Sequence, residues 1–175
     1  MVYPGIVTQQ VISVSSPSYE TDEALAWRAT QEMGAFQELY NRYQQFIYRY
    51  HYARTGDEQV AQDLTSRTFL AAGEQIASYR FSGRVVGWLF RIASRELGDY
   101  LDKGEYDFPA ELTRAINALP ADMAEALALR FFAGLSPSEI GLVMVKSDAV
   151  IKMLVYRGLC GVEVHLSSKA GIENV

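Results

Sequence analysis

Several residue types that would define a chemical class are scarce in this chain of 175 residues. A single cysteine, Cys160, excludes an internal disulfide and fits a reducing compartment. The two histidines, His51 and His165, are isolated from any metal-ligand spacing, and the phosphate-binding motifs GxxxxGK and GxGxxG are absent. The sequence therefore predicts no catalytic residues, no metal site and no cofactor, and we expect a protein that is not an enzyme.

The chain also lacks a surplus of basic residues and any long apolar run. Its 16 lysines and arginines are outnumbered by 21 acids, so the net charge is -5 and contact with nucleic acid would depend on local clusters. No stretch approaches the roughly 20 apolar residues that span a bilayer. No basic residue precedes Arg28, which argues against a signal peptide. We expect no membrane insertion and a cytoplasmic location.

What is present favours helices around a substantial core. The 175 residues leave room for one large domain or two small ones, and a hydrophobic content of 49% is enough to bury a core. Apolar residues recur at three- and four-residue spacing, which predicts an all-α fold with four helices in the first of two small domains. The predicted divisions are a flexible leader (1–20), a first domain (21–103), a linker (104–110), a second domain (111–166) and a tail (167–175).

Short motifs mark several helix ends. Gly56 and Asp57 are typical of the end of one helix and the start of the next. Ser136 and Glu139 have the spacing of a capping box, with Pro137 at the first helical position. A short helix, a turn at Val145 and a longer helix would then form a helix-turn-helix.

Two helical runs and the loop between them organise the first domain. The first run, DLTSRTFLAA, begins at Asp63, and the second, WLFRIASRELGDYL, begins at Trp88. The segment from Tyr79 to Arg84 joins them and has the sequence YRFSGR. Because aromatic rings stack on bases and arginines pair with phosphates, this loop could hold unpaired bases.

These runs resemble the extracytoplasmic-function (ECF) sigma factors of the sigma-70 family. In the second domain, the pattern LP-x(7)-LRFF-x-GLS-x-x-EI followed by KS-x-x-V-x-x-x-VYRGL is similar to that family's DNA-reading domain. The resemblance spans about Asp22 to Leu159. It implies a promoter-melting domain like sigma region 2 at 21–103 and a helix-turn-helix domain like sigma region 4 at 111–166. The implied partners are core RNA polymerase, promoter DNA and an anti-sigma factor or other regulatory protein.

The resemblance also assigns residues to three surfaces. The polymerase contact would be made by Asp63, Ser66, Arg67 and Leu70. The promoter -10 element would be met by Tyr79, Arg80, Phe81, Arg84, Arg91 and Arg95. The -35 element would be met by Lys146, Ser147, Lys152, Tyr156 and Arg157. Without the resemblance, the same residues would be interpreted as a solvated helix face, surface arginines and packed aromatics.

The chain departs from the family pattern in charge. Acids, namely Asp99, Asp102, Glu105 and Asp107, stand where the family usually carries a basic run, which weakens attraction to phosphate. Residues 111–166 hold six acids and five bases. Valine at position 145 replaces the glycine usual in the turn. An alternative is therefore a sigma-derived interaction protein that keeps the fold and the polymerase contact but lacks autonomous promoter recognition.

The linker departs in length. The seven residues from Lys103 to Pro109 reach at most about 25 Å, whereas the family's connection is usually longer. Leu101 and Leu112, which we expect to pack, would limit fraying of the adjoining helices. Either the two domains pack on each other, or they engage polymerase in an unusual arrangement.

Overall fold

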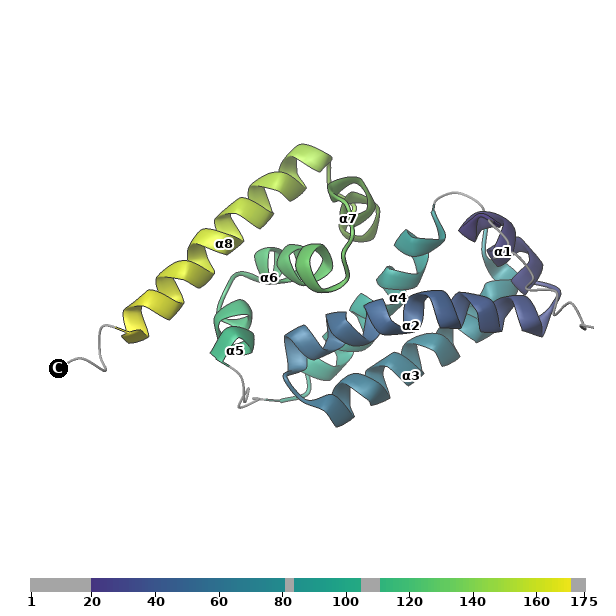
Figure 1. Cartoon of the computed structure of the whole chain (residues 1–175), viewed down its shortest axis with the longest axis horizontal. Coiled ribbons are helices and arrows are strands. Elements are labelled where there is room, and N and C mark those ends of the chain that lie inside the picture. Colours follow the sequence, from purple (N-terminus) through teal and green to yellow (C-terminus); the bar gives the residue numbers. More distant parts are fainter. Residues whose placement is uncertain (1–19, 81–83, 105–110, 171–175) are drawn as a thin grey trace, which may run out of the picture.

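The computed structural model describes residues 20–80, 84–104 and 111–170, and all regular secondary structure within them is helical (Figure 1). This confirms the predicted all-α fold. The N-terminal half holds four α-helices: α1 (Asp22–Ala29), α2 (Met33–Thr55), α3 (Glu58–Gln75) and α4 (Val85–Leu101). The C-terminal half holds α5 (Glu111–Asn117), α6 (Ala121–Leu127), α7 (Pro137–Met144) and α8 (Asp148–Ala170). A 3₁₀ turn (Ile76–Ser78) follows α3, and a π-helical turn (Ala128–Phe132) extends α6.

The helix ends lie close to the predicted positions because their capping residues behave as expected. Gly56 has a φ of 66° at the end of α2, a left-handed conformation that glycine adopts without steric cost. The Asp57 side chain then accepts a hydrogen bond of 2.9 Å from the Val60 amide at the start of α3. These two residues produce the sharp reversal that lays α3 against α2.

The helix-turn-helix in the C-terminal half is also present. Ser136 and Glu139 form the predicted capping box, in which the Glu139 carboxylate accepts the Ser136 amide at 2.8 Å. Val145 ends α7 with φ 56° and ψ 48°, the only left-handed residue other than glycine in the described part of the chain. A β-branched residue is strained in this conformation. The last helix continues to Ala170, beyond the predicted domain end at 166.

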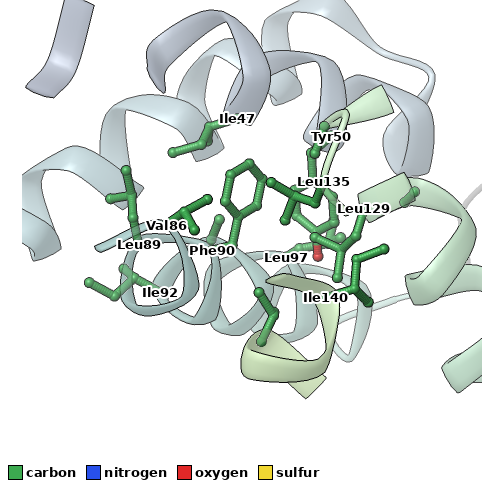
Figure 2. Packing of buried hydrophobic residues seen from close by; sticks show 14 of the residues in the cluster. Ile47, Tyr50, Val86, Leu89, Phe90, Ile92, Leu97, Leu129, Leu135 and Ile140 are labelled. Carbon is green, nitrogen blue, oxygen red and sulfur yellow. The ribbon is translucent and has the colours of Figure 1, made fainter. Parts of the chain in front are cut away.

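The two halves pack on each other, which is one of the two outcomes expected from the short linker. A single buried cluster draws on both halves (Figure 2). From the N-terminal half it includes Ile47, Tyr50, Val86, Phe90 and Leu97, and from the C-terminal half Leu129, Leu135, Ile140 and Val143. Leu112, in contrast, is 45% exposed, so its predicted packing role is wrong. Most of linker 104–110 lies outside the described residues, as do leader residues 1–19.

Candidate functional site

The four residues assigned to polymerase form one exposed row on α3. Asp63, Ser66, Arg67 and Leu70 recur at helical spacing, and all are exposed. Arg67 donates to the Asp63 carboxylate at 2.7 Å, with about half of each side chain in solvent. Leu70 is 69% exposed and lies at the edge of an apolar hollow described below. The row therefore combines a charged pair and an apolar residue on the exposed side of α3.

Two hollows flank this row. An apolar hollow of about 500 Å³ lies between α3 and the turn that joins α1 to α2, lined by Met33, Phe36 and Leu70 among others. Met33 is 85% exposed at its edge. A polar hollow of about 390 Å³ lies between α2 and α3, lined by Gln44, Gln45, Tyr48, Gln62 and Ser66 among others. The sequence analysis did not assign the α2 residues that line this hollow, although its glutamines, Gln44 and Gln45, lie next to each other in the sequence.

The residues assigned to the -10 element are only partly brought together. Tyr79 is buried and packs on Trp88, with ring centroids 5.0 Å apart. This burial also raises the pKa of Tyr79. Arg80 is exposed, and Phe81 lies outside the described residues. Tyr79 is therefore part of the core beside Trp88 and is not placed on the surface that the resemblance implies.

The α4 arginines form a stripe that α7 crosses. Arg84, Arg91 and Arg95 are exposed, and Gly87 lies between the first two on the same side of the helix. A Cβ atom built at Gly87 would lie 2.9 Å from the Leu142 Cβ on α7, so the helices approach closely only because residue 87 has no side chain. Glu139 of α7 places a carboxylate oxygen 3.7 Å from the Arg84 guanidinium.

The residues assigned to the -35 element lie on and just before α8. Ser147, Lys152, Tyr156 and Arg157 are exposed, and Ile151 and Leu154 on the other side of α8 are buried. Lys146 is half-buried and contacts Asp122 at 3.1 Å. Three of the five assigned residues therefore share an exposed helix face, and Lys146 is already paired within the C-terminal half.

A polar network joins the halves, and sequence reasoning did not find it. The Tyr50 hydroxyl donates to the Glu125 carboxylate at 2.7 Å, and Arg54 donates to the same carboxylate at 2.9 Å. Arg54 Nε donates to Asn117 Oδ1 at 2.9 Å, and Asn117 Nδ2 donates to the Arg54 carbonyl at 2.8 Å. The side chains of Arg54 and Glu125 are 9% and 14% exposed. We call these four residues the inter-half latch.

The described residues contain no group of three or more His, Cys, Asp or Glu side chains arranged to hold a metal ion. His51 is fully buried, with Nε2 3.2 Å from Thr68 Oγ1. Burial lowers the pKa of His51 to about 3, so the ring is neutral in the folded protein. None of the helices in the described ranges combines the length and the apolarity that crossing a bilayer requires.

Comparison with known proteins places these features in a family. Residues 39–105 match sigma-70 region 2. The chain is 34% identical over 155 residues to the ECF RNA polymerase sigma factor BldN of Streptomyces coelicolor, covering 73% of this chain and 59% of BldN. It is 29% identical over 144 residues to the ECF sigma factor SigM of Bacillus subtilis, covering 69% of this chain and 88% of SigM. The chain thus spans about three fifths of BldN and most of SigM.

The fold matches as well. The solved structure of CnrH in complex with the cytosolic domain of CnrY has a TM-score of 0.74 to this chain. The alignment has 20% identity and covers 85% of this chain and 99% of the other. An alignment that covers 85% of this chain includes residues of both halves, so this chain and CnrH have the same helical fold.

Proposed function

Because the chain belongs to the extracytoplasmic-function group of the sigma-70 family of RNA polymerase sigma factors, we propose that it binds core RNA polymerase and directs it to promoters. Polymerase would be bound through the α3 row, the -10 element through α4 and its preceding loop, and the -35 element through α8. The family is not enzymatic: polymerase makes the bonds, and a sigma factor supplies the promoter-reading surface. An anti-sigma factor or other regulatory protein is a further proposed partner.

The polymerase contact is carried by one observation, the exposure of Asp63, Arg67 and Leu70 in a row between two hollows. Leu70 and Met33 are both exposed and line the same apolar hollow, and exposed apolar residues that lie together mark an interaction site. The polar hollow on the other side offers glutamine and hydroxyl groups that can pair with a partner's side chains. A helical partner lying along α3 would fill both hollows at once.

The promoter contacts are supported by the exposed arginines of α4 and the exposed face of α8. Arg91 and Arg95 present guanidinium groups that pair with phosphates. Lys152, Tyr156 and Arg157 follow the turn of a helix-turn-helix, in which the second helix enters the major groove. The energy for separating the strands would come from contacts to the unpaired strand.

The test exchanges the charges of the α3 row. Asp63→Arg combined with Arg67→Asp keeps an ion pair within the helix but inverts the pattern that a partner meets. We expect this variant to lose co-purification with core polymerase and to keep its melting temperature, because both positions are exposed. The matched control, Asp99→Lys with Lys103→Asp, makes the same exchange at exposed positions of α4 and its end. Equal binding by the two variants would refute the α3 contact.

The alternative, a sigma-derived protein without autonomous promoter recognition, is favoured by the helix α7 that crosses the α4 stripe and by the excess of acids in the C-terminal half. Run-off transcription with host core polymerase on a pool of genomic promoters separates the two functions. Initiation by the protein alone supports the first proposal. Polymerase binding without initiation supports the second.

A further inference from the structure

We propose that the outer face of α8 pairs with the same face of a second copy of this chain, as an antiparallel pair of helices. Figure 1 shows α8 along the outer edge of the C-terminal half. The inference goes beyond the proposed function, because it names a partner for a surface that extends past the residues assigned to promoter DNA.

Six positions of α8 recur at the alternating spacing of three and four residues that forms the seam of a coiled coil. All six are exposed, and we call them the α8 seam: Val150, Met153, Arg157, Cys160, Val164 and Ser167. Residues on the opposite side of the helix, namely Ile151, Leu154 and Gly158, are buried in the C-terminal half. At about 1.5 Å per residue, the seam is about 26 Å long.

The α8 seam is largely apolar, although the described residues leave it uncovered. Met153 is 41% exposed and Val164 is 69% exposed. A helix with apolar residues on both its inner and its outer side is normally buried on both. Exposed apolar side chains that lie together along one face therefore mark an interaction site.

Promoter DNA accounts for only the first part of the seam. In a helix-turn-helix, the N-terminal residues of the second helix enter the major groove, and the residues assigned to the -35 element end at Arg157. Cys160 and Val164 lie one and two turns further along α8 and are also exposed. A partner helix that lies along α8, in contrast, would cover the whole seam.

The seam is complementary to itself when two copies run in opposite directions. If Met153 is placed across from Val164 of the second copy, the other four seam residues also fall into facing pairs. These pairs are Val150 with Ser167 and Arg157 with Cys160. A twofold axis repeats each contact, so one register places every residue of the seam against the second copy.

Charge favours the antiparallel direction. In a parallel pair the two Arg157 side chains would face each other, and like charges repel. In the antiparallel pair, Arg157 lies within about one turn of Glu163 of the second copy, an exposed acid beside the seam, and the twofold axis makes this contact twice. A charged residue in a largely apolar seam also fixes the register, at a cost in stability.

The expected dimer is weak and reversible. One pair of helices of this length buries less than the roughly 1,200 Å² that marks a stable interface, so the association is of the transient class. We expect a dissociation constant in the micromolar range. Because Arg157 belongs both to the seam and to the residues assigned to the -35 element, the dimer and that promoter contact exclude each other.

Two variants and their mixture test the pairing. Val164→Glu and Met153→Lys each place two unpaired charges in the apolar layers of a homodimer, and each should weaken self-association by about tenfold or more. Both positions are exposed, so the fold should be kept. An equimolar mixture should recover the dimer, because the introduced glutamate of one copy then faces the introduced lysine of the other. A parallel pair would keep these two side chains apart.

Sedimentation equilibrium of the full chain over a range of micromolar concentrations measures the association. Leu159→Glu is the matched control, because Leu159 is 47% exposed on α8 but lies outside the seam. We expect this control to dimerise like the unaltered chain, with circular dichroism to show that every variant is folded. A chain that stays monomeric, a Val164→Glu protein that dimerises normally, or a mixture that recovers nothing would overturn the proposal and leave the face to DNA or to a different protein.

The native Cys160 reports the same pairing independently. In the antiparallel register the two Cys160 side chains lie on either side of the twofold axis, about 4.5 Å apart along the helices. A short bismaleimide should therefore join the two chains. Cys160→Ser combined with Glu74→Cys moves the thiol to an exposed position on α3 and should not be joined. Equal cross-linking of the two proteins would contradict the pairing through α8.

These measurements are independent of the proposed function. Sedimentation and cross-linking use neither polymerase nor DNA, so a monomeric result would leave the polymerase and promoter contacts unaffected. Loss of polymerase binding by the α3 variant would, in turn, leave the dimer unaffected.

Discussion

Replacement of Val145 by glycine should make the protein more stable, although it removes a side chain. Val145 ends α7 with φ 56° and ψ 48° and is 82% exposed. The side chain therefore contributes almost no burial, whereas its β-branch makes a left-handed backbone unfavourable. The left-handed backbone at Val145 therefore lowers the stability of the folded protein, and contacts elsewhere in the fold compensate for it.

The expected size of the gain follows from two opposing effects. A residue other than glycine pays about 1–2 kcal/mol for the left-handed conformation. Glycine loses about 0.5–1 kcal/mol more conformational entropy on folding. The difference is a stabilisation of about 0–1.5 kcal/mol, and its middle value of about 0.75 kcal/mol raises the melting temperature of a chain of this size by about 1.5–3 °C.

Thermal unfolding followed by circular dichroism measures the effect, and two controls isolate its cause. Val145→Ala keeps a Cβ atom and should recover little of the strain. Val150→Gly places glycine within the first turn of α8 and should destabilise the protein by roughly half a kcal/mol through lost helix propensity. A Val145→Gly protein no more stable than Val145→Ala would show that strain at this turn does not limit stability.

Three further perturbations have defined outcomes. Burial lowers the pKa of His51 to about 3, so between pH 6.5 and 3 the histidine takes up a proton in the unfolded chain but not in the folded protein. The free energy of unfolding should therefore fall by about 1.4 kcal/mol for each pH unit of acidification in this range. His51→Leu should reduce the dependence of the urea midpoint on pH, and an unchanged dependence would contradict this explanation. Glu125→Leu leaves the Arg54 guanidinium buried without a carboxylate and should lower the free energy of unfolding in urea by about 3–5 kcal/mol, well above the loss for Glu125→Gln. Equal urea midpoints for the two variants would show that the carboxylate of the latch contributes nothing to stability. Ser136→Ala removes the cap of α7 and should cost about 1 kcal/mol by thermal unfolding, and no change would show that the cap is dispensable.

Local features of the fold were predictable because neighbouring residues determine them. Gly56, Asp57 and the Ser136 capping box set helix ends through hydrogen bonds that reach three or four residues along the chain. Helical spacing alone predicted that Asp63, Ser66 and Arg67 lie away from the buried side of α3, and the family resemblance added Leu70 to the row. Both partners of each such hydrogen bond lie within a few residues of each other, so a short sequence pattern is enough to predict it.

The contacts between halves were not predictable in the same way. Tyr79, assigned to DNA, is buried against Trp88, and a tyrosine suits either environment. The latch joins Arg54 to Asn117 and Glu125, which are 63 and 71 residues further along the chain, and no local spacing relates them. Gly87 offered one signal, because a glycine within an apolar helix usually marks a close approach, but the pattern did not say that Leu142 is the neighbour.

The shared cluster of buried residues has a consequence for how this protein can be divided. Because Val86 and Phe90 lie in one core with Leu129 and Leu135, heat should melt both halves in a single calorimetric transition. A fragment ending at residue 104 would expose the apolar side chains that the C-terminal half now covers. Such a fragment should self-associate in solution, and adding the separate C-terminal fragment should restore a monodisperse species. In this chain, the boundary between the two halves is a boundary of sequence and not of folding.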